Sequence, residues 1–468
     1  MIGSGAASTK WARPNNRPLG TIRKNYRKYW NEEEECISPD VQRGMEQEKL
    51  ARQLEYVYAN APFYRSKFDQ VGLKPGSIRH VEDLSRLPFT TKAELRESQE
   101  QTPPFGDYLA APKNDVSIVH RTSGSTGRFI FTVMTKNDLR QTNEIGARSC
   151  WSAGIRPHNI VVHCLNYQLW MGGYTDHSNL EAVGAAVIPY GVGSSKQLVR
   201  IIEEARATGI SSTPSYPNVL EHVVRDELGI EPYDLGIKVG IFYGEPGLED
   251  PNFRAHVEET WGMRASSAYG LADSMSNLAA VCDDVYELHF LGQGALIAQI
   301  IDPTTGDDLP IEEGNVGELV LTNIDREAQG LIRYRTRDMV QIRGTGPCKC
   351  GRTGFRFRIS GRSDDMLIVK GINVFPSGVA EVLNKLVPDV TGEFQIVLDR
   401  PGPYEVLDID VEFGRGLEQS ELEGLRRRVE KTLRDELVFT ARVRLVPPGT
   451  VPRTDMGKAP RIVKTYDD

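Results

Sequence analysis

The chain has 468 residues, 39% of them hydrophobic and 26% charged, and a formal net charge of −8 at pH 7. This length exceeds what one ordinary hydrophobic core holds, so two or three domains are expected. The acidic balance argues against a nucleic-acid partner. No apolar stretch is long enough to span a bilayer or to form the core of a secretory signal, so no membrane partner is expected. The 6 cysteines are too sparse for a disulfide scaffold and suit a reducing cytoplasm.

The predicted elements begin after a leader, because residues 1–24 mix Gly, Ser, Pro and basic residues without periodicity and should be flexible. Apolar residues at helical spacing predict a helix over 41–59, and Thr91 followed by Glu94 predicts a capped helix start. From residue 115 to residue 325, β-type runs alternate with helical stretches, which predicts βαβ units and a largely parallel sheet. The expected elements there are strands at Ile160–Leu165, Ala185–Tyr190, Ile210–Thr213 and Lys238–Phe242 and a helix at Ser195–Thr208.

The C-terminal third changes character. Residues 316–342 read as antiparallel strands, and residues 417–437 as an amphipathic, charge-rich helix. Between them, Asp364 and Asp365 stand in a polar turn that leads into an apolar run, Gly371 and a proline-terminated exit. We therefore expect an α/β protein. Its large N-terminal domain, 25–363, would hold mixed and parallel sheets flanked by helices, and its small α+β domain, 364–468, would be mobile.

A phosphate-binding loop is a candidate at residues 121–127, Arg-Thr-Ser-Gly-Ser-Thr-Gly, which follow a β-type run. The glycines permit close approach of the backbone, and hydroxyls stand beside the backbone N–H groups, which together make a concave anion site for a polyphosphate. The segment is not a Walker loop, since GxxxxGK[ST] is absent, and an ordinary surface loop is the alternative. The candidate contacts are Thr122, Ser123, Gly124, Ser125, Thr126 and Gly127.

A metal-binding set is a second candidate. Cys348 and Cys350 form a Cys-x-Cys knuckle followed by glycine, and Cys282 and His289 lie upstream, seven residues apart. Three thiols and one imidazole complete a tetrahedral set suited to structural Zn²⁺. Unligated residues are the alternative, because Cys-x-Cys is shorter than the usual spacing of zinc knuckles.

The segment 361–376, GRSDDMLIVKGINVFP, resembles the hinge of adenylate-forming enzymes of the phenylacetate–CoA ligase-like branch. The resemblance covers residues 29–465 and includes the stretches YWNEEEE and APFYRSKF. The Ser/Thr/Gly loop is similar to the family's ATP loop, with Arg128 where the family usually has Lys, and the Cys/His arrangement is common in this branch. The resemblance implies ATP-dependent activation of a carboxylic acid, with a C-terminal domain that turns about Asp364 between two half-reactions.

The same resemblance implies an adenine slot. The stretch Gly244-Glu245-Pro246 would form one wall, and Ala268-Tyr269-Gly270 would place a ring near adenine. Asp273 would serve Mg²⁺, although the family usually has Glu there and Asp reaches less far. Read without the resemblance, the first stretch is a strand-ending turn.

The ribose would bind at Asp338, whose carboxylate can accept hydrogen bonds from both hydroxyls. Arg362 would be a second ribose or phosphate contact. The family has Gly where this chain has Arg337, and the alternative for Asp338 is a surface ion pair with Arg335 or Arg337.

Lys458, preceded by Gly457, resembles the family's catalytic lysine. Its ammonium would stabilise the charge that builds up on the α-phosphate and the attacking carboxylate, whereas a solvated charge is the alternative. After rotation of the domain, the Gly371 loop would line a tunnel for the thiol. The acid pocket would take aromatic and glycine residues, with helix packing as the alternative. Its candidates are Tyr167, Trp170, Gly172, Gly173, Tyr174 and Tyr216.

The resemblance thus implies an acid–CoA ligase that acts on an aryl or arylacetic acid with ATP, Mg²⁺ and CoA, and the cysteine usage predicts a cytoplasmic setting. Transfer to the phosphopantetheine of a carrier protein, or to an amine, is the first alternative. A nucleotide-binding regulator without turnover is the second. The oligomeric state stays open, with a homodimer among the alternatives.

Overall fold

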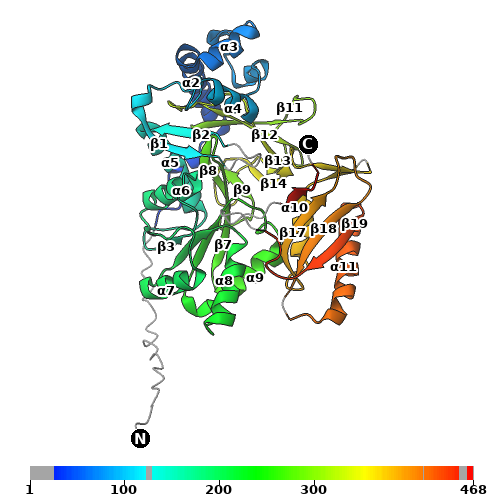
Figure 1. Ribbon diagram of the computed structural model, residues 1–468. Coiled ribbons are helices and arrows are strands. Elements are labelled where there is room, and N and C mark those ends of the chain that lie inside the picture. The colour runs from blue at the N-terminus through cyan, green and yellow to red at the C-terminus, as the bar shows by residue number, and fades with distance from the viewer. Residues whose placement is uncertain (1–25, 123–128, 371, 415, 453–460, 467–468) are drawn as a thin grey trace.

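The computed structural model describes residues 26–122, 129–370, 372–414, 416–452 and 461–466. None of the helices in these ranges combines the length and the apolar composition that crossing a membrane requires. Figure 1 shows two lobes, a large one that ends in the yellow strands and a small one in orange and red.

A sheet of 12 strands runs through the large lobe in the order β11-β10-β12-β13-β14-β9-β8-β7-β6-β5-β3-β4. Strands β4, β3, β5, β6 and β7 pair in parallel, and the other pairings are antiparallel, which confirms the expected mixed sheet. The expectation of largely parallel pairing up to residue 325 is wrong beyond β7, because the chain reverses directly from β7 into β8 and the strands from β8 to β12 pair antiparallel. The bounds are β3 (Ile160–His163), β4 (Ala186–Pro189), β5 (Gly209–Ser212), β6 (Val239–Phe242), β7 (Arg264–Leu271), β8 (Met275–Ala280), β9 (Leu288–Phe290), β10 (Leu296–Ile301), β11 (Asp308–Leu309), β12 (Val316–Asn323), β13 (Tyr334–Gly344) and β14 (Arg356–Arg362).

Helices cover both faces of the parallel part, whose central strands β5 and β6 are buried along their whole length. Val161 and Ile241 pack with α5 and α6 on one face, while their chain neighbours Val162 and Phe242 pack with α7 and α9 on the other. Successive side chains of a strand point to opposite faces, so two separate cores result. The helices are α5 (Lys136–Ser152), α6 (Met171–Ala182), α7 (Ser195–Ala205), α8 (Tyr216–His222) and α9 (Pro251–Trp261). The helix expected to reach Thr208 ends at Ala205, because Arg206 takes a left-handed C-cap with φ of 49°.

The N-terminal helices and a two-stranded sheet complete the large lobe (Figure 1). The helix expected over 41–59 lies within α2, and Thr91 and Glu94 form the expected capping box. The elements are α1 (Glu32–Glu35), α2 (Pro39–Asn60), α3 (Pro62–Gln70), α4 (Lys92–Gln101), β1 (Val116–Arg121) and β2 (Phe131–Thr135). Short helical turns are η1 (Pro75–Ser77), η2 (Val81–Arg86), η3 (Lys113–Asp115), η4 (Val223–Glu227) and η5 (Pro232–Leu235).

The small lobe has its own core. A hairpin of β15 and β16 leads into a 4-stranded sheet of order β19-β18-β17-β20, and α10 and α11 pack on that sheet. The expected charge-rich helix is α11, whose Leu425, Val429 and Leu433 are buried. The bounds are β15 (Leu367–Val369), β16 (Ile372–Val374), α10 (Pro376–Asn384), β17 (Val390–Leu398), β18 (Leu407–Phe413), α11 (Gln419–Leu437), β19 (Ala441–Val446) and β20 (Ile462–Lys464).

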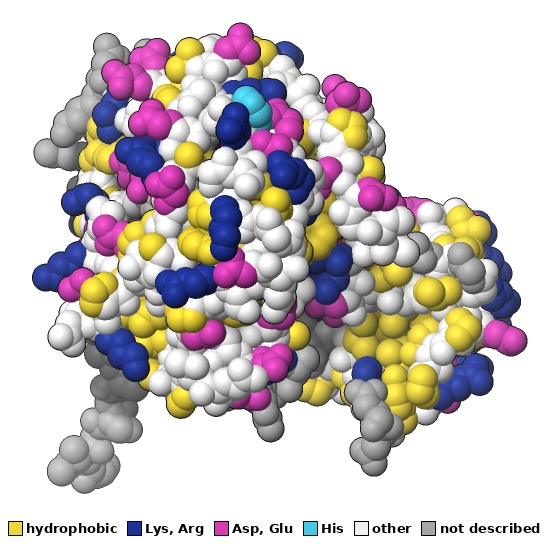
Figure 2. Space-filling view, turned by 90° about the horizontal axis from the view of Figure 1, so that it is seen from above, with side chains coloured by type: hydrophobic (Ala, Val, Ile, Leu, Met, Phe, Trp, Pro, Cys, Tyr) yellow, Lys and Arg dark blue, Asp and Glu magenta, His cyan; other side chains and the backbone are white. Residues whose placement is uncertain are grey.

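Charges are mixed on the surface. On the face drawn in Figure 2, basic and acidic side chains are interspersed rather than gathered into patches of one sign.

Candidate functional site

A buried carboxylate joins two strands at the centre of the site. Asp338 of β13 accepts a hydrogen bond at Oδ1 from Arg362 Nη1 at 2.9 Å and at Oδ2 from Tyr269 Oη at 2.5 Å. The pairing of β13 with β14 sets Asp338 directly opposite Arg362. Burial raises the pKa of Asp338, and the Arg362 guanidinium opposes that rise. The strand register therefore brings together three of the expected nucleotide contacts.

The surface ion-pair alternative for Asp338 is wrong. Arg335 donates two hydrogen bonds to Glu318 of β12, at 2.9 and 2.7 Å, and Arg337 lies 3.7 Å from the same carboxylate. The Glu318 side chain is fully buried, and these two cations balance the charge of its carboxylate, which would be costly to bury unpaired. Sequence reading missed Glu318, because only the pairing of β12 with β13 places it beside both arginines.

The stretch after β6 faces its parallel neighbour. Gly244 has a φ of 89°, a conformation that favours glycine. Glu245 Oε1 accepts hydrogen bonds from the backbone N and the hydroxyl of Ser215, at 3.1 and 2.5 Å, so the wall from Gly244 to Pro246 is fixed to the segment after β5. Ala268, Tyr269 and Gly270 follow on β7, which pairs with β6. A Cβ on Gly270 would lie 1.8 Å from the carbonyl oxygen of Ser276, so only glycine fits there.

Asp273 stands just beyond β7 with an unsatisfied oxygen. Its Oδ1 is buried without a hydrogen-bond partner, while Oδ2 lies 3.4 Å from Lys92 Nζ. The pKa of Tyr334 is raised by burial and further by the neighbouring Asp273. A buried carboxylate oxygen without a donor is a suitable ligand for a hard cation such as Mg²⁺. Lys92, the first residue of α4, was not anticipated from the sequence.

The expected phosphate loop lies almost wholly outside the described residues. Of its members, only Thr122 is described: its backbone N donates to Ile130 O at 3.0 Å, and its hydroxyl accepts from Ile130 N at 3.3 Å. Residues 123–128 are not described, and neither are Gly371 or Lys458, so these assignments stay predictions.

The two lobes join between β14 and β15. Arg362 Nε and Nη2 bind the two oxygens of Asp364 at 2.9 Å each, so one guanidinium bridges Asp338 and the turn. Across the interface, Arg358 donates to Glu381 of α10 at 2.7 Å, and Ser377 Oγ donates to Ser360 O at 2.6 Å. A cavity of about 210 Å³ lies between the lobes beside these contacts.

The expected acid-pocket residues occupy two places around α6 and the end of β3. Tyr167 Oη lies 2.7 Å from His177 Nδ1, and burial raises the pKa of the Tyr216 hydroxyl to about 12. Both phenols lie near Cys164, which raises their pKa further. Tyr174 is exposed, near His120. The structure thus places Tyr167 and Tyr216 each near Cys164 and leaves Tyr174 exposed near His120.

Two glycines at the start of α6 are held by His163, which sequence reading missed. Its Nε2 lies 3.0 and 2.9 Å from the carbonyl oxygens of Gly172 and Gly173, and its Nδ1 lies 2.8 Å from Ser211 Oγ. Carbonyls only accept, so Nε2 carries the proton. Burial lowers the pKa of His163 to about 4, so the ring is neutral. A Cβ on Gly173 would lie 2.2 Å from Asn166 O, which explains the glycine.

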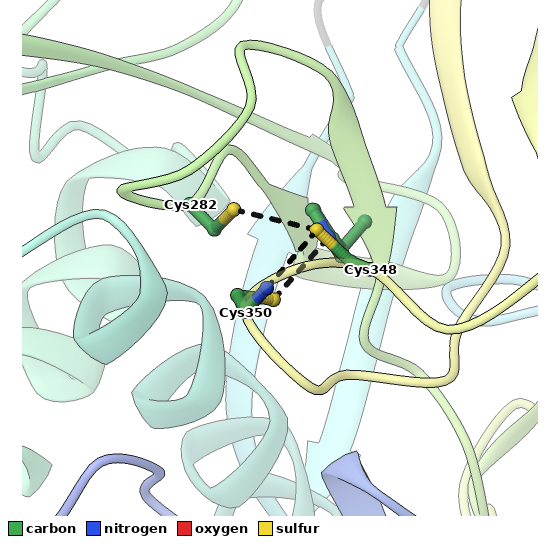
Figure 3. Close-up of side chains that lie close together, drawn as sticks. Cys282, Cys348 and Cys350 are labelled. Atoms are coloured by element: carbon green, nitrogen blue, oxygen red, sulfur yellow. Dashed lines mark hydrogen bonds between the residues drawn. The ribbon is translucent and has the colours of Figure 1, made fainter.

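The predicted Cys/His set does assemble. The sulfur atoms of Cys282, Cys348 and Cys350 and a nitrogen of His289 lie within 4.8 Å of one another, and all four residues are buried. Figure 3 shows the three cysteine side chains of this set close together. His289 Nδ1 lies 3.2 Å from the carbonyl of Glu287, which orients Nε2 toward Cys350 Sγ at 3.6 Å. Three sulfurs and one ring nitrogen match the donor set of structural zinc sites.

The cysteine loop also holds the N-terminal segment. Tyr29 Oη donates to Cys350 O at 2.8 Å, and Arg352 Nε binds Glu35 Oε2 at 2.7 Å. The Glu35 and Arg352 side chains are 0% and 5% exposed. Loss of the loop's geometry would leave a buried charge unpaired, which is costly.

Comparisons with known proteins agree with this geometry. The family model described as AMP-binding enzyme C-terminal domain matches residues 371–465. The phenylacetate-coenzyme A ligase of Thermus thermophilus is 35% identical over 446 residues, with 92% of this chain and 98% of that protein covered. The crystal structure of 2-hydroxyisobutyryl-CoA ligase in the postadenylation state, in complex with 2-HIB-AMP, superposes with a TM-score of 0.87 at 28% identity, covering 98% of this chain and 95% of that one. The same enzyme in the thioesterification state, with 2-HIB-AMP and CoA, gives a TM-score of 0.69 over the same shares of both chains.

Proposed function

The chain belongs to the phenylacetate–CoA ligase family of adenylate-forming enzymes, and we propose that the acid it activates is an aryl or arylacetic acid. It is an AMP-forming acid–thiol ligase, which converts a carboxylic acid and ATP to an acyl-adenylate and then forms a CoA thioester. A carboxylate oxygen attacks the α-phosphorus and expels pyrophosphate. The CoA thiolate then attacks the acyl carbon of the mixed anhydride and expels AMP.

The observation that carries the nucleotide assignment is the buried cluster of Asp338, Tyr269 and Arg362. The two carboxylate oxygens of Asp338 offer further acceptor positions for vicinal ribose hydroxyls. The wall from Gly244 to Pro246 lies one strand away and would border the adenine. The loop 122–127 would hold the phosphates.

Mg²⁺ belongs to the proposal because Asp273 Oδ1 is buried without a partner. Asp273 would hold the ion, and the ion would neutralise charge on the ATP phosphates. Lys458 would stabilise the charge that develops at the α-phosphate.

A rotation about Asp364 would separate the half-reactions, with residues 25–363 and 364–468 as the two bodies. In support, two states of 2-hydroxyisobutyryl-CoA ligase differ in their similarity to this structure, although their sequence is the same. The TM-score is 0.87 for the postadenylation state and 0.69 for the thioesterification state. The present arrangement is the one similar to the postadenylation state. The Gly371 loop would line the thiol tunnel after rotation, with free CoA as the acceptor. Carrier-protein phosphopantetheine and an amine are the alternative acceptors to test, and a homodimer is the oligomeric state to test.

The aromatic acid is supported by Tyr167 and Tyr216 near the end of β3 and by Trp170 at the start of α6. A structural Zn²⁺ is supported by the donor set of Cys282, His289, Cys348 and Cys350. It would fix the loop that holds Glu35 and Tyr29. All six cysteines are free, which suits a cytoplasmic setting.

The test is acid-dependent AMP release from ATP with aryl, arylacetic and aliphatic acids, each with and without CoA. Release that needs both an aromatic acid and CoA supports the proposal. Pyrophosphate exchange without CoA-driven turnover points to a carrier protein or an amine, and an absence of exchange with every acid supports a nucleotide-binding regulator.

Two variants separate the half-reactions. Lys458→Ala should abolish adenylate formation and largely spare thioester formation from supplied adenylate. Asp364→Pro should block rotation and spare one half-reaction. Equal loss of both half-reactions in either variant contradicts the role assigned to that residue.

A further inference from the structure

The first turns of α6 lie between the strand that leads to the phosphate loop and the strand that follows Asp273. Arg121 N, at the end of β1, donates to Leu169 O at 2.7 Å, and His120 Nε2 lies 2.9 Å from Thr175 Oγ1. On the other side, Asn179 Nδ2 donates to Ser276 Oγ of β8 at 3.2 Å. These contacts place residue 176 of α6 between β1, which leads to the proposed phosphate loop, and β8, which follows Asp273.

That residue is Asp176, a carboxyl without a counter-charge. Asp176 is only 2% exposed. The pKa of Asp176 is raised well above its usual value by burial and lowered in part by the Ser276 hydroxyl; no cation of the described residues contributes. Burial thus favours the protonated form of this carboxyl, which both donates and accepts a hydrogen bond.

Asp176 borders a gap beside the indole of Trp170. A Cβ on Gly172 would lie 3.4 Å from Asp176 Oδ2, 3.4 Å from Leu165 Cδ1 and 4.0 Å from Trp170 Cε3. Gly172 is itself partly exposed. The glycine therefore leaves a gap whose sides are an aromatic ring, a methyl group and one carboxyl oxygen.

A second polar group in the same core lacks a partner. The Tyr243 hydroxyl, just after β6, is buried without a well-formed hydrogen bond, and the Ser211 hydroxyl and the Cys150 thiol lie beside it. Burial raises the pKa of Tyr243 well above its usual value, and the charges of Cys150 and then Asp176 raise it further. Tyr243 also packs in the apolar cluster of α5, α6, β6 and β8. A buried hydroxyl left unpaired costs about 1–3 kcal/mol, a cost that a ligand with a complementary polar group removes.

We propose that Asp176, with Tyr243, determines substrate specificity: the acid carries an uncharged hydroxyl or amino substituent that hydrogen-bonds to the Asp176 carboxyl. The inference rests on the proposed function and narrows its substrate class. The apolar sides of the gap contact the part of the acid that carries the substituent. Asn179 Nδ2 already donates to Asp176 Oδ1 at 3.4 Å, and Asp176 selects against acids that lack the substituent because they add no hydrogen bond at Oδ2, which borders the gap.

The experiment compares kcat/KM for matched acids that differ in one group: benzoate with hydroxy- and aminobenzoates, and phenylacetate with hydroxyphenylacetates. The wild type should favour a substituted acid by at least tenfold, and whether hydroxyl or amino is preferred identifies the substituent. Asp176→Ala should bring the ratio close to one, and Tyr243→Phe should reduce it. The ratio of kcat/KM for the substituted and the plain acid, measured on one preparation, does not depend on how much of the protein is folded. A residue with a purely structural role would therefore leave this ratio unchanged.

Asp176→Asn keeps the volume and hydrogen-bonding capacity and should keep part of the preference, which guards against misfolding of the alanine variant. Glu46→Gln changes another buried carboxyl, remote from α6 in sequence, and should leave the ratio unchanged. Equal use of plain and substituted acids by the wild type, or an unchanged ratio in both Asp176→Ala and Tyr243→Phe, would overturn the inference alone. Absence of AMP release with every acid would overturn the proposed function, and the inference with it.

Discussion

Replacement of Asp338 by Asn tests the centre of the proposed nucleotide site. The carboxylate accepts from Arg362 Nη1 at 2.9 Å and from Tyr269 Oη at 2.5 Å. Asn has the same shape but only one acceptor oxygen and no charge, so it loses about one charge-assisted hydrogen bond. Such a bond is worth about 1.5–3 kcal/mol, which corresponds to roughly 10- to 150-fold in affinity.

Ribose contacts exist both before and during adenylation, so their loss should raise the KM for ATP and leave kcat nearly unchanged. ATP–pyrophosphate exchange at varied ATP concentration measures both constants. Stability should fall only slightly, because Arg362 keeps its two hydrogen bonds to Asp364.

Asp410→Asn is the matched control. Asp410 accepts a charged hydrogen bond from Arg444 on the small lobe, and that arginine side chain is 72% exposed. The control should leave the KM for ATP unchanged. A KM for ATP within twofold of wild type in Asp338→Asn, in a folded variant, would refute the ribose assignment.

Three further expectations concern the metal, the pH dependence and the interface between the lobes. Protein purified without chelator should contain about one zinc per chain, which the Cys348→Ser/Cys350→Ser double variant should lose together with thermal stability; metal-free wild type contradicts the site. Burial raises the pKa of Glu46 from its ordinary value of 4.5 to about 7, so the unfolded chain loses this proton at lower pH than the folded protein. The free energy of unfolding therefore falls as pH rises between these values. Glu46→Gln should therefore stabilise the protein at pH 8 by up to about 3 kcal/mol and hardly at all at pH 4 in urea unfolding; equal effects at both pH values contradict the shift. Arg358→Ala removes a half-exposed ion pair with Glu381 worth up to about 1 kcal/mol, so adenylation should slow a few-fold relative to thioester formation; an unchanged ratio of the two rates contradicts a role in holding the lobes.

Local patterns in the sequence were sufficient for much of the fold. The helix α2, the strands β3, β5 and β6 and the capping box at Thr91 follow from periodicity and spacing, because each pattern describes contacts within one element. The residue types and the family resemblance also predicted the Cys/His set, which assembles, whereas the hinge at Asp364 stays a prediction. Both depend on residue types at fixed spacing, which remain visible in an unfolded chain.

The pairing of charges did not follow from the sequence. Asp338 was open to an ion pair with Arg335 or Arg337, which are its chain neighbours. Only the register of β12, β13 and β14 decides that these arginines bind Glu318 and that Asp338 binds Arg362. Such register is set by contacts between strands, which chain spacing does not record.

Protonation states likewise needed the tertiary structure. Asp176 stands between Thr175 and His177 as an ordinary polar helix residue, and the sequence analysis did not select it. The raised pKa of its carboxyl depends on burial between α6 and β8, where no cation among the described residues opposes the rise, and this environment arises when distant segments pack together. The sequence by itself determined which chemical groups this enzyme carries and in what order, whereas packing decided which of them meet and in which charge state.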